Sequence, residues 1–485
     1  MFDFGESPVT EPRHSPVKWP ALLAGPALLL VALLLPPPAG MAPAAWLCAG
    51  MGLWMAVWWA TEAIPIPATA LLPLVLGPLL GLTTMTGAAQ PYAHPIVFLF
   101  MGGFMLGLTM ERWQLHRRLA LVILCKVGGE PRRQIAGFML ATAFLSMWVS
   151  NTATSVMMLP IAMSVVGLLP LELGDQRRRY AVALLLAIAY SASIGGIATL
   201  IGTPPNALLA AYLHSSHGIE LGFAQWMMLG LPVSLAMLLC CWWLLSRGGF
   251  GDIERYCGAD ISRRALADMG AMSRPERRIA AVFAITAAAW IFRPLITQWL
   301  PGLTDTGIAI LAGVMLFILP AGKDHHHLLD WPTAQRLPWG VLMLFGGGLS
   351  LAAMIGSSGL AEWIAQQFAL LEALPTLALV VLIVVVMIFL TELTSNTATT
   401  AAFLPLLGAL AVSQGLSPIL FCAAAAVAAS CAFMMPVATP PNAVVFGSGE
   451  LEIRDMMRQG FRLNLLGIVL VSLLAYGVIS LFWLA

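Results

Sequence analysis

Charged residues are scarce in this sequence: only 10% of its 485 residues are Asp, Glu, Lys or Arg, whereas 60% are hydrophobic. A water-soluble domain carries about 25% charged residues, so the composition excludes a soluble protein. Apolar runs long enough to cross about 30 Å of hydrocarbon recur from the Pro20 region to the last residue and leave no segment for an independent soluble domain. We therefore expect an all-α polytopic membrane protein with one membrane domain.

From the N-terminus, the cysteines and the histidines we expect no cleavable signal, no disulfide framework and no metal site. The first twenty residues are polar and contain four prolines, unlike the basic start and short apolar core of a signal peptide. We expect residues 1–17 to form a cytoplasmic tail. The seven cysteines show no paired zinc-type spacing, and the run DHHHLLD at 324–330 is interpreted as a solvated turn, because three adjacent histidines cannot easily face one ion. The net charge of +1 does not identify a partner, and we expect neither nucleic acid nor an organic cofactor.

Hydropathy predicts eleven spans along the chain. They cover residues 18–38, 42–60, 61–81, 96–112, 179–213, 222–246, 277–299, 304–320, 338–356, 417–446 and 461–484. Two further apolar segments, 134–168 and 375–412, are each interrupted by a Ser-Asn-Thr triplet. We interpret both segments as hairpins that enter and leave the membrane on one side.

The basic residues predict the orientation. With a cytoplasmic N-terminus, every Lys and Arg except Arg293 falls on the inner side, as the positive-inside rule requires. We therefore expect a multi-pass protein of the inner (plasma) membrane. A single crossing at 134–168 would place Arg177, Arg178 and Arg179 outside, whereas a re-entrant hairpin or a tight pair of spans would both keep them inside.

Three motifs recur in the same order, which indicates an internal repeat. GGFMLG at 102–107 resembles GGLSLA at 347–352, and SNTAT at 150–154 recurs at 395–399, both 245 residues later; TPPN at 203–206 recurs at 439–442, 236 residues later. On the predicted topology the two hairpins open from opposite sides, so the repeats have inverted topology. Secondary transporters built in this way bind substrate near the midplane, where helices are broken.

The repeat divides the chain into two halves. The first half, 18–246, contains hairpin 134–168 and broken helix 179–213. A cytoplasmic linker, 247–276, leads to the second half, 277–485, which contains hairpin 375–412 and broken helix 417–446.

The broken segments offer neutral groups for binding ions. A helix break frees backbone groups that need a partner, and the TPPN threonines, Thr203 and Thr439, are predicted N-caps whose helix starts suit an anion. Back-bonding hydroxyls and simple proline kinks are the alternatives, but the duplication favours function. No Lys or Arg adjoins these motifs, so an anion would need a co-bound cation such as sodium. Glu62 and Glu392 are further candidates, although Glu62 could also serve only as a cap.

Together with TEAIPIPATALLPLV at 61–75 and FLFMGGFMLGLTMERWQLHRRLA at 98–120, these motifs resemble the divalent anion/sodium symporter family, the INDY-type di- and tricarboxylate carriers. The resemblance covers nearly the whole chain after the tail. It implies a homodimer of eleven spans plus two re-entrant hairpins, with a scaffold domain and a transport domain that moves like an elevator.

The resemblance also implies site residues. One sodium ion would use Ser146, Ser150, Asn151 and Gly202, and a second would use Thr391, Thr394, Asn396 and Ala438. The substrate carboxylates would contact Asn151, Thr152, Thr203 and Pro204 from the first half, and Ser395, Asn396, Thr397, Thr439 and Pro440 from the second. Thr394 stands where some members have a smaller residue.

The expected function is sodium-coupled uptake of C4-dicarboxylates (succinate, malate, fumarate) or related di- and tricarboxylates. A sodium-independent dicarboxylate exchanger is the alternative, because relatives with the same motifs use either mode. A channel or an inorganic-ion antiporter is more remote, since no continuous polar pore face is visible in the sequence. An enzyme is not expected, because no Ser-His or paired-Asp arrangement recurs at membrane depth.

Overall fold

The computed structural model describes residues 18–128, 130–247, 250, 251, 253, 260–322, 326–367 and 374–483. The expected tail (1–17), residues 254–259 of the linker and residues 324 and 325 of the histidine run lie outside the described residues. Regular structure in the described part is helical, as the composition predicted, and one isolated β-bridge joins Pro320 to His327.

The helices of the first half are α1 (Trp19–Leu34), α2 (Pro43–Thr61), α3 (Ile66–Thr69), α4 (Leu72–Leu79), α5 (Met85–Ala89), η1 (Gln90–Ala93), α6 (Pro95–Arg112), α7 (Leu115–Val127), α8 (Pro131–Ser146), α9 (Asn151–Gly167), η2 (Leu171–Leu173), α10 (Asp175–Ile197), α11 (Pro204–His217) and α12 (Phe223–Ser246). Those that follow are α13 (Asp260–Asp268), α14 (Arg274–Ile296), α15 (Asp305–Ile318), α16 (Trp331–Ala334), α17 (Trp339–Ser357), α18 (Leu360–Gln367), α19 (Thr376–Thr391), α20 (Asn396–Ser413), α21 (Pro418–Ala429), α22 (Pro440–Phe446), α23 (Ile453–Val478) and η5 (Ile479–Trp483).

Among the described residues, eight helical segments are long and apolar enough to cross a membrane. They are α2, the segment Met85–Arg112, α10, α12, α14, α17, α20 and the segment Ile453–Trp483. Seven of the eight lie in expected spans, whereas α20 lies in the expected hairpin 375–412. The other expected spans correspond to shorter apolar helices, namely α1, α3 with α4, α15 and α21. The polytopic all-α class is therefore confirmed, and the number eleven stays a prediction.

Prolines decide where several helices begin and break. Proline occupies the first helical position of α2, α6, α8, α11, α21 and α22, where its missing N–H costs nothing. The expected span 61–81 is instead two short helices, α3 and α4, with a turn at Ala70 and Leu71 between them. Pro73 in the first turn of α4 has no N–H to continue α3, which explains the break.

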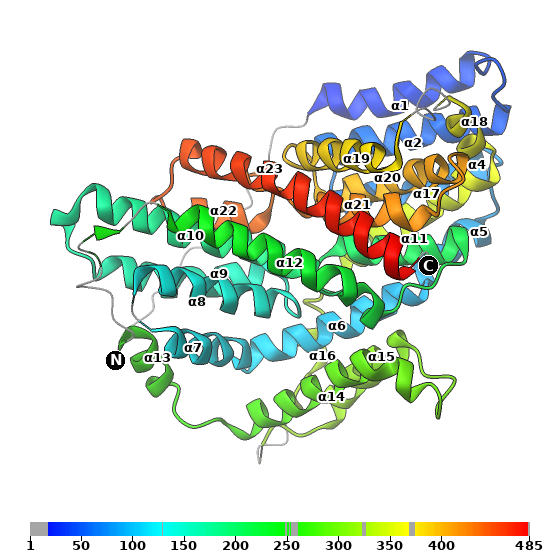
Figure 1. Cartoon of the computed structure of the whole chain (residues 1–485). Coiled ribbons are helices and arrows are strands. Elements are labelled where there is room, and N and C mark those ends of the chain that lie inside the picture. The colour runs from blue at the N-terminus through cyan, green and yellow to red at the C-terminus, as the bar shows by residue number, and fades with distance from the viewer. Residues whose placement is uncertain are drawn as a thin grey trace.

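Helix α10 forms the centre of the fold. From Tyr180 to Ile197 every side chain except the half-buried Val182 is buried, and the helix packs against α8, α9, α12 and α22. Figure 1 shows it between the α8 and α9 pair and α22, whereas α14 and α15 lie at the edge of the molecule beside α6. A helix that is hydrophobic all round is typical of a protein core or of a membrane span, and α10 lies in the core.

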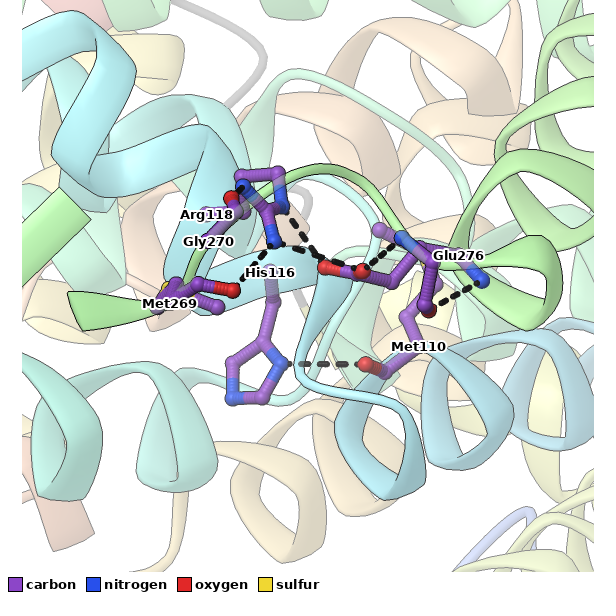
Figure 2. Close-up of polar contacts among 7 residues, drawn as sticks. Met110, His116, Arg118, Met269, Gly270 and Glu276 are labelled. Atoms are coloured by element: carbon purple, nitrogen blue, oxygen red, sulfur yellow. Dashed lines mark hydrogen bonds and ion pairs between the residues drawn. The ribbon is translucent and has the colours of Figure 1, made fainter. Parts of the chain in front are cut away.

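Helix α7 was not predicted from hydropathy, because three basic residues within thirteen hide its apolar face. Arg118 on its polar side binds Glu276 at the start of α14, with Nε 2.7 Å from Oε1. The same guanidinium donates to the carbonyl oxygens of Met269 and Gly270, and Figure 2 shows these contacts converging on the arginine. The pair therefore joins the segment after α6 to the end of the linker.

Candidate functional site

The first Ser-Asn-Thr triplet lies at the break between α8 and α9. Ser150 is the N-cap of α9, and its hydroxyl accepts a hydrogen bond from the backbone N–H of Ala153 (3.2 Å). The hydroxyl oxygen of Ser146, the last residue of α8, lies 2.5 Å from Asn151 Oδ1 and 2.6 Å from the carbonyl oxygen of Ala192 on α10. The break thus gathers side-chain oxygens of α8 and α9 and a carbonyl oxygen of α10.

Glycines let the backbone of the first broken helix join this cluster. A β-carbon on Gly196 would lie 2.9 Å from Asn151 Oδ1 and 3.0 Å from the carbonyl oxygen of Gly202. A β-carbon on Gly202 would collide with the Gly196 backbone. The structure therefore brings together Ser146, Asn151 and Gly202, three of the four expected ligands of the first sodium ion, while Ser150 caps α9 beside them.

The asparagine that ends each TPPN motif holds the broken helix open. Asn206 Nδ2 lies 2.8 Å from the Thr199 carbonyl oxygen and 3.2 Å from that of Gly196. A helix break frees such carbonyls, and a buried carbonyl without a donor is costly. The role of this residue was not predicted from the sequence, although its place in the repeated motif was the available signal.

The second half repeats these contacts 236 residues later. Asn442 Nδ2 lies 3.2 Å from the Ala432 carbonyl oxygen and 3.0 Å from that of Met435. Both TPPN threonines are N-caps as predicted. The Thr439 hydroxyl accepts from the Asn442 N–H (3.3 Å), whereas the Thr203 side chain caps no N–H. Equivalent asparagines thus bind equivalent carbonyls in both halves.

Glu392 distinguishes the second half. Its buried carboxylate accepts hydrogen bonds from the backbone N–H groups of Phe433 (2.7 Å), Met434 (3.0 Å) and Met435 (3.1 Å). The amide of Asn464 on α23 donates a further one, at 2.7 Å. Of the two acidic candidates, Glu392 therefore caps the unwound stretch between α21 and α22. Glu62 is an exposed residue at the C-terminus of α2, with φ of 48°.

The second triplet also caps its helix, and two threonines precede it. Ser395 is the N-cap of α20. The Thr391 hydroxyl bonds back to the Ile388 carbonyl (3.2 Å), and the Thr394 hydroxyl lies 2.8 Å from the Leu390 carbonyl and 2.6 Å from Thr399 Oγ1. Within the described part of the chain, no donor reaches the buried Oδ1 of Asn396. Its amide oxygen is thus available to a ligand.

Packing across the repeat brings the four motifs together. Helix α9 packs against α22, and α11 packs against α20, so the second helix of each hairpin contacts the TPPN helix of the other half. Within this cluster Ser150, Thr152 and Pro440 are exposed, Asn151, Pro204, Thr397 and Asn396 are partly buried, and Thr203, Thr439 and Ala438 are buried. A cluster of neutral oxygens and helix starts suits a small cation and an anion held together.

The chain is similar to known proteins over nearly its whole length. A family model described as sodium:sulfate symporter transmembrane region matches residues 16–484. The chain is 42% identical over 467 residues to the sodium-dependent dicarboxylate transporter SdcS of Staphylococcus saprophyticus, covering 94% of this chain and 90% of that protein. It is 40% identical over 473 residues to SdcS of Staphylococcus aureus strain USA300, with the same coverage.

Among solved structures, the chain is similar to the Alcanivorax borkumensis YdaH transporter, whose crystal structure reveals an unusual topology. The TM-score is 0.61, and the match covers 89% of this chain and 99% of that chain at 17% identity. At this identity the likeness concerns the fold alone.

Proposed function

The chain belongs to the sodium:sulfate symporter family, and from that premise we propose that it couples sodium entry to the uptake of C4-dicarboxylates. Relatives at 40–42% identity carry the name sodium-dependent dicarboxylate transporter. The observation that carries the proposal is the pair of broken helices, each held open by a TPPN asparagine and each packed against the hairpin of the other half. The protein is a transporter and not an enzyme.

The proposed first sodium site consists of Ser146, Ser150, Asn151 and Gly202. The 2.5 Å approach of Ser146 Oγ to Asn151 Oδ1 and the closeness of Asn151 to Gly202 across Gly196 support it. Carbonyl and hydroxyl oxygens at a helix break are typical ligands of coupling ions in transporters.

The proposed second sodium site consists of Thr391, Thr394, Asn396 and Ala438. The unpaired Oδ1 of Asn396 supports it. The hydroxyls of Thr391 and Thr394 bond to their own helix, so the carbonyl oxygens of these residues are the better candidates for ligands.

The substrate carboxylates would lie between the two sodium sites. The proposed contacts are Asn151, Thr152, Thr203 and Pro204 from the first half and Ser395, Asn396, Thr397, Thr439 and Pro440 from the second. The N-termini of α11 and α22 direct their positive dipole ends toward an anion, and co-bound sodium would balance its charge.

The proposed topology has a cytoplasmic N-terminus in the inner membrane. Contacts between distant segments support it, because each joins segments that the charge pattern places on the same side. Arg118 binds Glu276, and Arg112 binds Asp330. Arg178 binds Asp455 on the same predicted side, whereas Arg293, the one predicted outer arginine, binds Asp305.

The homodimer, the re-entrant form of the two hairpins and the elevator motion are also proposals, supported by the resemblance of the motifs. Crosslinking in native membranes, with the mass of the crosslinked species as the readout, tests the dimer. Labelling of cysteines introduced at exposed Ser150 and at Thr397, from each side of the membrane, tests the hairpins.

Uptake of labelled succinate into proteoliposomes tests the function. A symporter takes up succinate with an inward sodium gradient and no internal substrate, and fails when potassium replaces sodium. Uptake that needs internal succinate but not sodium would assign the sodium-independent exchanger instead. Currents far above carrier turnover would indicate a channel.

A further inference from the structure

A cavity of about 820 Å³ lies between the start of α10, the end of α12 and the first turns of α23, three helices that Figure 1 shows side by side. It contains none of the Ser-Asn-Thr or TPPN residues. Gly196 at the break lies seventeen positions along α10 from Arg179 in the cavity wall, which at 1.5 Å per residue is about 25 Å. The cavity is therefore distinct from the proposed transport site.

Arginines dominate the polar wall of this cavity. They are Arg178, Arg179, Arg247, Arg458 and Arg462, against the single carboxylate of Asp455. Arg178 binds Asp455 (2.9 Å) and Glu452 (2.8 Å). Across the described residues, no carboxylate lies within ion-pair distance of Arg458 or Arg462, which lie one turn apart on α23. The guanidinium fork suits the oxygens of a phosphate, so the cavity fits a phosphate-bearing anion.

Apart from Gln459, the rest of the cavity wall is apolar and includes Val182, Leu244, Leu245, Leu465 and Leu466. A soluble phosphate would gain nothing from such a wall. A phosphate that carries a hydrocarbon chain would bury apolar surface there.

An exposed apolar track leads away from the cavity along two helices that pack together. On α12 it consists of Leu231, Leu235, Leu239 and Trp243, which are 39%, 60%, 58% and 47% exposed. On α23 it consists of Leu465, Val469 and Leu473, which are 46%, 55% and 55% exposed. Spacing of four residues aligns each row on one helix face. Both helices have the length and hydropathy of membrane spans, so the track faces acyl chains.

We propose that this cavity binds the phosphate head group of an anionic phospholipid, with an acyl chain lying along the track on α12 and α23. Arg247, whose guanidinium carbon lies 3.4 Å from the centre of the Trp243 ring, marks the level of the membrane interface, where aromatic and basic residues gather. The charge pattern assigns this end of the helices to the cytoplasm, the leaflet that carries anionic lipid.

Titration of dioleoylphosphatidylglycerol into the delipidated full-length protein in detergent tests the proposal, with the rise in Tm as the readout. The double variant Arg458→Gln/Arg462→Gln should raise the half-saturating lipid concentration about thirtyfold, since each basic residue near anionic lipid contributes about fivefold. Arg458→Lys/Arg462→Lys, which keeps both charges, should fall between that variant and the wild type. This series separates lipid binding from a folding defect, which would lower Tm without lipid.

The matched control is Arg274→Gln/Arg277→Gln, which removes two exposed arginines of α14 outside the cavity and should titrate as the wild type does. Dioleoylphosphatidylcholine tests the need for a net negative charge on the lipid, and glycerol phosphate tests the need for an acyl chain. Both should bind the wild type at least tenfold more weakly than dioleoylphosphatidylglycerol does. Equal binding of glycerol phosphate and intact lipid would overturn the lipid assignment in favour of a soluble phosphate. If Arg458→Gln/Arg462→Gln and the wild type have the same half-saturating concentration of dioleoylphosphatidylglycerol, the cavity is not the binding site.

Discussion

The carboxylate of Glu392 accepts hydrogen bonds from the Met434 backbone N–H through both of its oxygens, each at 3.0 Å. Glu392 is the third residue before the triplet of the second hairpin, and Met434 lies in the unwound stretch of the second broken helix. One ion-dipole contact thus fixes the distance between the two segments that supply the proposed second sodium site. In the first half, at the equivalent place, the Met147 carbonyl accepts from Thr199 Oγ1 (2.6 Å).

Glu392→Gln should impair transport. The amide retains one acceptor oxygen and turns an N–H₂ group toward the Met434 and Met435 N–H groups, and hydrogen bonds to a charged group contribute about 1.5–3 kcal/mol each. We expect the sodium concentration for half-maximal uptake to rise about tenfold or more. Glu62→Gln, which changes an exposed carboxylate in the same way, is the control; equal uptake by both variants would contradict the role of Glu392.

Asn151→Ala and Asn396→Ala should each abolish succinate uptake while the protein still elutes as one species in size-exclusion chromatography. Each change removes an amide oxygen from a proposed sodium site and a contact to the substrate. Ser164→Ala removes an exposed hydroxyl on α9 whose hydrogen bond among the described residues is to the Pro160 carbonyl, and this variant should transport normally. Wild-type uptake in either asparagine variant would refute the assigned site.

Gly202→Ala should abolish sodium-dependent uptake, because its methyl group cannot fit against the Gly196 backbone without opening the break. Gly167→Ala is the matched substitution in α9, where a β-carbon meets no atom within 4 Å. It should leave uptake unchanged and stabilise the helix by up to about 1 kcal/mol. Similar losses in both variants would show that the crowding at Gly202 is not the cause.

Asn206→Ala and Asn442→Ala should each lower thermal stability, since each leaves buried carbonyl oxygens without a donor at a cost of about 1–3 kcal/mol. Fluorescence-detected size-exclusion chromatography after heating measures the effect. Ser216→Ala, at an exposed position on α11, should leave the melting curve unchanged. If the asparagine variants melt with the wild type, these amides do not hold the breaks.

The ionised carboxylate of Asp330 should stabilise the fold at neutral pH, and this contribution to the Tm should be lost only in acid. Hydrogen bonds from Thr333 and Arg112 lower its pKa from 3.8 to about 2. A carboxyl group with a lowered pKa stabilises the fold above its unfolded value and loses this contribution as pH falls through the folded value. The Tm difference between wild type and Asp330→Asn should therefore be constant above pH about 5 and vanish toward pH about 2. A difference that persisted at the acid end would contradict this account.

The sequence by itself determined the membrane class, the paired breaks and most of the proposed ligands. Scarcity of charge requires a bilayer, and the repeated Ser-Asn-Thr and TPPN motifs each stop or start a helix at the predicted place. These features follow from local chemistry, namely hydropathy, N-caps and proline, which act within a few residues.

Tertiary structure decided what local chemistry leaves open. The hydrogen bonds of Glu392 to Phe433, Met434 and Met435 join residues about forty positions apart in the sequence. The hydrogen bonds of the Asn206 and Asn442 amides depend on carbonyl groups that are free only where the folded helix is broken. The amphipathic α7 is held by Arg118 and Glu276, 158 residues apart. The arginine cavity exists only because α10, α12 and α23 meet, since contacts between distant segments depend on how helices pack and not on any single stretch of sequence.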